Sequence, residues 1–282
     1  MSYDIKTCDR FSKQLNDITY TDYFYRIGGL ARSVYQWENL PNSINGEWIE
    51  RFLFTDGECM FFKDDTLGFM VTKVTSSGVN EYDEPIDLRP TANNYSNPNT
   101  YQNNKNAVLI KNNADGIPSI HTVELFSMRL ANITRAIDVN VDQQKTSTLI
   151  ICDEKQRLSL KRVYQQWAGN EPVIYGDKLL SNTPIQALRT DAPIVFDKLQ
   201  LQKNAILNEC YTFLGINNSN QDKRERLVSD EVSANDEQIE AHAERMYSAR
   251  KRACDMINKL FDLNVSVSRT IKGKSEAKED EC

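Results

Sequence analysis

The sequence has few of the residues that most often build metal, redox or catalytic centres. Its 282 residues include two histidines and six cysteines. The cysteines are scattered singly, without a CxxC pair or a Cys/His pair at metal-ligand spacing. His121 and His242 lie far apart, and no Ser or Cys nucleophile motif accompanies them. We therefore expect reduced thiols that mostly pack in the interior, no structural metal and no catalytic triad.

Long apolar segments are also missing. No window approaches the roughly 18 uncharged apolar residues of a membrane-spanning helix, and the mean hydropathy is −0.57. The N-terminus has no basic segment followed by an apolar one, as a secretory signal would. We expect a cytoplasmic, unprocessed chain with no membrane partner.

An excess of positive charge is absent as well. The formal net charge is −6 and the isoelectric point about 5.2. Proteins that hold duplex DNA through many phosphate contacts usually have a basic domain or a basic face. Sequence-specific DNA recognition is therefore disfavoured. Transient contact stays compatible with this charge, because a protein along which DNA must slide cannot hold phosphates tightly.

No nucleotide-binding motif is complete. Gly273-Lys274-Ser275 resembles the end of a phosphate-binding loop, but Ser268 stands where the first glycine of that motif belongs. We expect no cofactor.

One acidic segment could serve a metal-dependent nuclease, since carboxylates along a loop suit hard cations. Basic residues precede it immediately, so a solvated loop of mixed charge is the simpler interpretation. The nuclease remains the enzyme alternative to a chain that we expect not to be an enzyme. Its carboxylates would be those of Asp230, Glu231, Asp236 and Glu237.

The N-terminal part is predicted to begin with a helix. Apolar residues recur at three- and four-residue intervals from Asp17 to Leu40, and Pro41 would end the helix. Gly28-Gly29 would be either a break or a close helix contact.

Short antiparallel strands are predicted next, between Arg51 and Val74, from the aromatic and β-branched runs Phe52–Phe54, Met60–Phe62 and Phe69–Val74. Residues 76–106 are polar and without periodicity. They predict a long loop that contacts another chain, with at most a short strand at Ile86–Leu88. A strand is expected at Ala107–Lys111.

Two long amphipathic helices are predicted in the second half. The first begins near Ser119 and keeps an apolar stripe over about five turns. The second starts near Asp191–Pro193 and stops at Gly215, with Lys203 interrupting its apolar stripe. Residues 147–190 between them predict a compact insertion, with strands Thr148–Ile151 and Pro172–Tyr175 and a helix Leu158–Trp167.

The C-terminal part is predicted to hold one more helix. Asn235–Gln238 can form a capping box, and apolar residues continue from it to Leu260. A strand at Val265–Val267 and a charged, disordered tail follow. The fold class is therefore α+β, mainly helical.

Several segments resemble the upper-collar proteins, also called portal or head-tail connector proteins, of phi29-like short-tailed bacteriophages. The resemblance covers roughly residues 35–267 and is densest after Lys145. The segments that carry it are Tyr35–Pro41, Leu158–Tyr175, Thr190–Asn204, Phe213–Asn217 and Glu225–Glu240.

The resemblance implies a portal fold with a wing of short antiparallel strands, long stem helices and a small clip containing β-strands. The expected regions are an N-terminal helix and wing β region (1–118), a stem helix (119–146), the clip (147–190), a second stem helix (191–215), a channel loop (216–235), a wing helix with the final strand (236–268) and a disordered tail (269–282).

The resemblance also implies a function. Twelve copies would form a ring at one capsid vertex of the virion, the channel for double-stranded DNA during packaging and ejection and the attachment point of the tail. The implied partners are the packaging ATPase, the lower collar or tail protein, and the major capsid and scaffolding proteins. Near the N-terminus, where the family has a Lys/Arg cluster, only Lys6, Arg10 and Lys13 stand, so a packaging RNA stays open. The alternative is another ring-forming collar protein.

The implied site residues line the channel. Arg189 and Lys198 stand where the family has channel cations, and we expect their rings to centre the duplex without holding it. The channel loop would contribute Lys223, Arg224, Arg226, Asp230 and Glu231.

Overall fold

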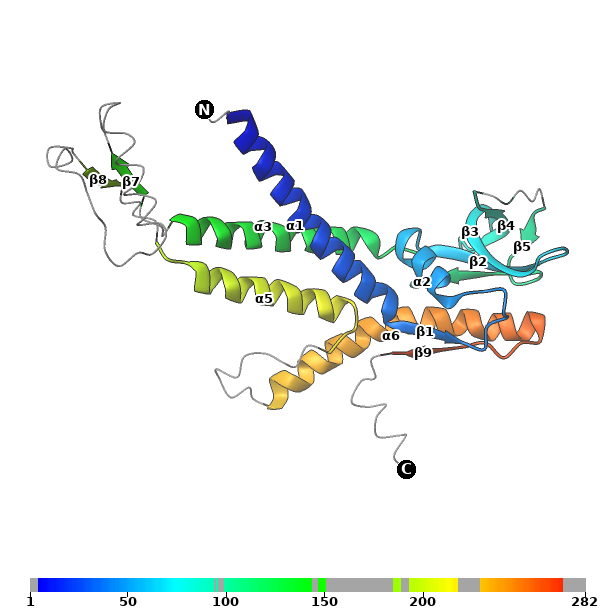
Figure 1. Cartoon of the computed structure of the whole chain (residues 1–282). Helices are drawn as coiled ribbons and strands as arrows, with labels where there is room; N and C mark the ends of the chain where they lie inside the picture. Colours follow the sequence, from blue (N-terminus) through cyan, green and yellow to red (C-terminus); the bar gives the residue numbers. More distant parts are fainter. Residues whose placement is uncertain are drawn as a thin grey trace. The chain divides into compact units, whose positions relative to one another are not determined.

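The computed structural model describes residues 5–93, 95, 99–143, 147–150, 185–188, 193–217 and 229–270 (Figure 1). The chain divides into two compact units. The first consists of Met1–Ile133 and Gln202–Cys282, and the second of Thr134–Leu201. No helix in the described ranges is long and apolar enough to cross a membrane.

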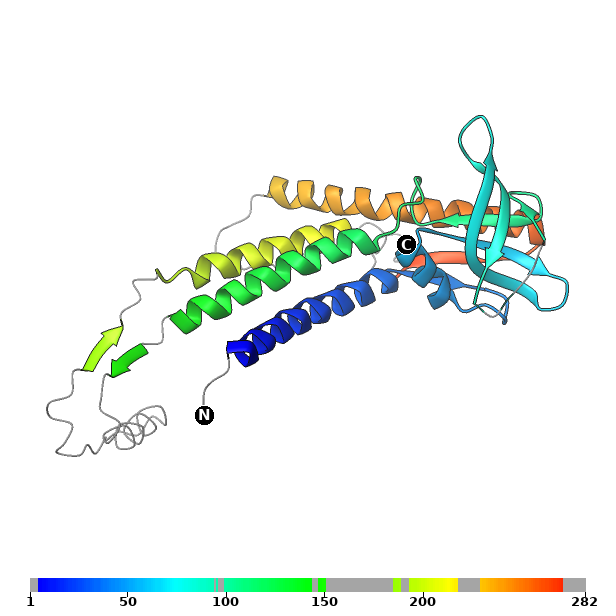
Figure 2. The same ribbon diagram turned by 90° about the horizontal axis from the view of Figure 1, so that it is seen from above.

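A five-stranded antiparallel sheet forms one end of the first unit, in the order β5-β4-β3-β2-β6. Figure 2 shows its strong twist. The strands are β2 (Glu58–Asp64), β3 (Gly68–Val79), β4 (Pro85–Thr91), β5 (Tyr101–Gln102) and β6 (Ala107–Lys111). β2 is buried on both faces, because Cys59 and Phe61 pack into one hydrophobic cluster and Met60 and Phe62 into another.

The strand predictions are partly confirmed in this sheet. β2, β3 and β6 form where aromatic and β-branched runs predicted them. The strand expected at Phe52–Phe54 is wrong, because these residues belong to helix α2 (Gly46–Thr55), whose first turn is capped by the side chain of Asn45. The apolar residues Ile49, Leu53 and Phe54 are buried on one face of this helix.

The long loop expected at residues 76–106 is also wrong in part. β3 continues to Val79 and pairs with β4 up to the register Val79↔Pro85. Leu88 and Tyr101 from this stretch are buried. The far part of the hairpin is exposed on both faces, so it shows none of the alternation that identifies a half-buried strand.

The first helix and the strand after it differ from the prediction. α1 spans Ile5–Ser33, so the helix starts earlier and ends earlier than expected. Residues Tyr35–Glu38 form β1, which pairs antiparallel with β9 (Ser266–Arg269) alongside α6. Gly28 is a close helix contact and not a break, because a Cβ there would lie 3.3 Å from the ring of Phe54.

The two long helices are confirmed. α3 spans Ile120–Gln143 and α5 spans Phe196–Phe213. Within the first unit, Val123, Phe126 and Leu130 of α3 pack with Cys210 of α5 and Tyr23 of α1 in a shared core. Lys203 does not break this packing, since its Nζ lies 5.7 Å from the centre of the Tyr23 ring.

The last helix begins before its predicted capping box. α6 spans Ser229–Phe261, so residues 229–235, expected in the channel loop, are helical. Ser229, Asp230 and Glu231 are residue types that favour a helix N-terminus, in agreement with this earlier start. β9 confirms the final strand, and residues 271–282 of the expected tail lie outside the described part.

The second unit contains the end of α3, a two-stranded antiparallel sheet and the start of α5. β7 (Ser147–Ile150) pairs antiparallel with β8 (Ile185–Leu188). Asn140 holds the start of α5: its Nδ2 donates to the Pro193 carbonyl at 3.0 Å, and its Oδ1 accepts from the Val195 N–H at 3.1 Å. The helix expected at 158–167 and the strand at 172–175 lie outside the described residues.

Candidate functional site

The predicted channel residues fall into three groups according to where the structure places them. Lys198 stands in the first turn of α5 and is exposed. In the part of the chain that the structure describes, it forms no ion pair. Asp230 and Glu231 lie in the first turn of α6. Arg189, Lys223, Arg224 and Arg226 lie outside the described residues, so the channel site is an expectation for which one side chain, that of Lys198, is placed.

The geometry of α6 disfavours the nuclease alternative. All four of its carboxylate residues belong to this helix. At about 1.5 Å of rise per residue, Asp230 and Asp236 are separated by about 9 Å along the helix axis. Side chains that share one ion from a single helix come from residues three or four apart. Within the described ranges, no group of three or more His, Cys, Asp or Glu could hold a metal ion.

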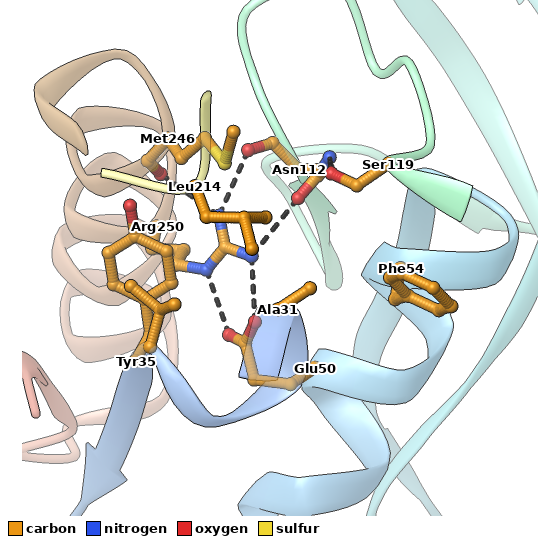
Figure 3. Close-up of a pocket in the computed structure, with 10 residues that line it drawn as sticks. Ala31, Tyr35, Glu50, Phe54, Asn112, Ser119, Leu214, Met246 and Arg250 are labelled. Carbon is orange, nitrogen blue, oxygen red and sulfur yellow. Dashed lines mark hydrogen bonds and ion pairs between the residues drawn. The ribbon is translucent and has the colours of Figure 1, made fainter. Parts of the chain in front are cut away.

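A buried ion pair is the strongest polar feature of the first unit. Arg250 of α6 donates from Nε to Glu50 Oε1 at 2.8 Å and from Nη2 to Oε2 at 2.7 Å. Both side chains are only 3% exposed. Figure 3 shows the two groups facing each other, with the Tyr35 ring against the guanidinium. A paired, planar contact of this kind is among the stronger hydrogen-bonded interactions in proteins.

Further hydrogen bonds complete this cluster. Arg250 Nη1 donates to the carbonyls of Asn112 and Met246 at 2.9 and 3.0 Å, and Nη2 donates to Asn112 Oδ1 at 3.1 Å. Trp37 Nε1 donates to Glu50 Oε1 at 2.8 Å. Asn112 Nδ2 in turn donates to Ser119 Oγ, just before α3, at 2.9 Å. The cluster therefore joins β1, α2, the end of β6, the start of α3 and α6.

The electrostatics of the cluster are those of residues that hold secondary-structure elements together. Burial opposes the charge of Arg250, but Glu50 outweighs it, and the pKa of the guanidinium is raised. Burial raises the pKa of the Tyr35 phenol to about 12, against the opposing effect of Arg250. The Tyr35 hydroxyl donates to the Ala243 carbonyl at 2.9 Å. The Arg250 guanidinium and the Tyr35 phenol therefore stay protonated near neutral pH, and both are hydrogen-bonded within the fold, so the cluster has the character of a scaffold and not of a catalytic centre.

This cluster does not follow from the sequence pattern. Glu50 and Arg250 are 200 residues apart in the sequence, and no local motif links them. One signal was available: Arg250 falls on the buried side of α6, among Met246, Ala253 and Ile257. A charged residue in an apolar stripe predicts a buried partner, although it does not say which one.

The end of α5 is a tightly built corner. Gly215 has φ +70°, its N–H donates to the Thr212 carbonyl, and the Ile216 N–H donates to the Tyr211 carbonyl at 2.9 Å. This is a Schellman motif, which needs a left-handed residue at that position. A Cβ on Gly215 would lie 2.5 Å from the Cβ of Ala243 in α6. Glycine therefore lets α5 end directly against α6.

Comparison with known proteins agrees with this architecture. The sequence model of the family described as Phage Connector (GP10) matches residues 3–272. A chain in the structure "Portal and tail of native bacteriophage P68" has a similar fold, with a TM-score of 0.54, 13% identity, and coverage of 100% of this chain and 96% of that one. A chain in "Virion of native gene transfer agent (GTA) particle" gives a TM-score of 0.50 at 9% identity, covering 91% of this chain and 83% of that one.

Proposed function

We propose that this chain, which belongs to the phage connector (GP10) family, forms a closed ring of twelve copies through which viral DNA passes during packaging and ejection. The match over residues 3–272 is the observation that carries the proposal. The family is a structural, non-enzymatic one, and the chain is a portal or head-tail connector protein. Identical copies joined head to tail close into a ring when the rotations at successive contacts add up to one full turn, and otherwise form an open filament.

The ring would sit in the virion at the head-tail junction, at one vertex of the capsid. Its proposed partners are the packaging ATPase, which would supply the energy of translocation, and the lower collar or tail protein. The major capsid and scaffolding proteins would surround it during assembly in the host cytoplasm. A fold similar to a chain from the portal and tail of bacteriophage P68 supports this placement.

The proposed channel cations are Lys198 and Arg189. Lys198 is exposed and forms no ion pair in the described ranges, so its charge is free to act on a polyanion. Twelve-fold repetition turns each cation into a ring of charge. A subunit of net charge −6 with isolated basic rings attracts DNA weakly, whereas a uniformly basic bore would trap it at low salt.

Complementation tests the function directly. Phage that lack this protein should form particles without nuclease-protected DNA, and supplying the wild-type chain should restore protected DNA. Particles that fill with DNA without this chain would contradict the proposal.

The same assay tests the channel cations. Lys198→Ala combined with Arg189→Ala should reduce the amount of protected DNA, because the attraction that centres the duplex is lost. Arg26→Ala is the matched control, since it removes an exposed arginine that is paired with Asp22 at 3.1 Å. DNA packaging and retention equal to wild type in the double variant would rule out this role.

A further inference from the structure

We infer that Arg269 positions the two flanks of the inter-helix segment (residues 218–228), because its single guanidinium contacts both the end of α5 and the following helix α6. The functional part of this inference rests on the proposed function, in which this segment belongs to the channel loop. The observations concern only the described residues on either side of the segment.

The contacts of Arg269 link both flanks. Arg269 is the last residue of β9, and its side chain is 3% exposed. Its Nη1 donates to Glu240 Oε1 of α6 at 2.6 Å. Its Nη2 reaches the carbonyl of Gly215 at the end of α5, with 3.5 Å between the two atoms. One side chain therefore contacts the last turn before the segment and the helix that follows it.

The backbone around this contact leaves little freedom. Gly215 lies so close to Ala243 that a Cβ would not fit between them. The Ala243 carbonyl also accepts the hydrogen bond from the Tyr35 hydroxyl of β1. The end of α5, the middle of α6 and the β1-β9 pair thus meet at one corner, and Arg269 closes it.

The chemistry of Arg269 is unusual for a residue that only fills space. The burial pattern of β9 places its side chain at an interior position, where Val267 is the preceding buried residue. Its Nε has no hydrogen-bond partner in the part of the chain that the structure describes. A buried donor without a partner is costly, and an apolar side chain would avoid that cost. The planar guanidinium of arginine can donate to two acceptors from separate nitrogens in a fixed geometry. Lysine has a single side-chain nitrogen and cannot reproduce this geometry.

The consequence is mechanical. In the proposed ring, a force that DNA exerts on the inter-helix segment would be transmitted to α5 at one end of the segment and to α6 at the other. Because one guanidinium joins both flanks to β9, the two flanks move together. Arg269 is a positioning residue for the segment.

Amide hydrogen exchange of the purified full-length protein tests the inference. In Arg269→Lys, peptides that cover residues 212–217 and 237–243 should exchange about tenfold faster than in wild type, because the flanks open locally more often. Glu240→Gln removes the negative charge of this half-exposed acceptor but keeps an amide oxygen that can accept from Arg269, so the variant should fold normally and give a smaller increase in the same peptides.

Val267→Ala is the matched control. This residue is buried in the same strand, so its truncation lowers overall stability without removing the link between the flanks. Exchange in the two peptides of Arg269→Lys that is no faster than in Val267→Ala would overturn the inference. Faster exchange in purified Arg269→Lys, found together with phage that fill with DNA in the absence of this chain, would support the positioning role and contradict the proposed function.

Discussion

At the residue scale, Glu50 and Arg250 decide how the first unit is held together. Two buried charges gain little net stability as a pair, because each loses its hydration, but removing one partner leaves the other charge buried alone. The cluster around them joins three helices and two strands through buried side chains that are hydrogen-bonded to one another. The pair therefore contributes more to determining which elements come together than to the net free energy of folding.

Removing one charge of this pair should be strongly destabilising. Glu50→Gln or Arg250→Met should each lower the free energy of unfolding by about 3–5 kcal/mol, measured from thermal or urea unfolding at fixed protein concentration. The combined Glu50→Gln, Arg250→Met variant should lose clearly less than the sum of the two single losses, because no charge is left unpaired.

Asp22→Asn serves as the control for this prediction. Asp22 and Arg26 form an exposed pair, and losing it should cost less than about 1 kcal/mol. A loss in Glu50→Gln as small as that of the control would mean that the buried pair does not hold the unit together.

At the element scale, the β3-β4 hairpin is the least supported part of the sheet. Its far end is exposed on both faces, and Tyr82 at the tip is 84% exposed. The turn is held locally, because Asn80 Oδ1 accepts from the N–H groups of Tyr82 and Glu84 at 2.9 and 3.0 Å. The hairpin is thus an ordered arm that buries little of the core.

Two tyrosines of this sheet should differ sharply in their contribution to stability. Tyr82→Ala should change the free energy of unfolding by no more than about 0.5 kcal/mol. Tyr101→Ala should cost about 3 kcal/mol, because Tyr101 is buried and its ring lies 4.8 Å from that of Phe62. Urea unfolding of the two variants checks this, and equal losses would show that the tip is buried in the purified protein.

Elements with a buried face were predictable from the sequence, and others were not. The stripe of α3 and the run of β6 can be recognised in the sequence because most of their buried positions are apolar. The far hairpin is polar on both faces, so its strands look like a loop. Trp37 fits a helical stripe and a strand equally well by spacing, and the pairing of β1 with β9, more than 200 residues away, decides between them.

The same limit applies to the site. The roles of Lys198 and of the channel loop are implied by a family resemblance, because the local periodicity of the sequence contains no signal for a central channel. The Glu50-Arg250 pair and the Arg269 contacts depend on residues brought together by the fold. A sequence shows that such a charge is buried only when the charge interrupts an apolar stripe, as Arg250 does.

At the scale of the whole molecule, the proposed function requires that each chain be one subunit of a ring. α3 carries exposed apolar side chains, such as those of Leu125 and Met128, which suit a subunit that packs against other copies of itself. Exposed apolar residues on a helix are usual where another copy packs.

Native mass spectrometry of the purified protein, combined with electron-microscope class averages, tests the central claim most directly. The account predicts a closed ring of about 390 kDa, twelve times the chain mass of 32.4 kDa, with a central bore wide enough for duplex DNA. A protein that stays a monomer or dimer at micromolar concentration, or a ring without such a bore, would contradict it.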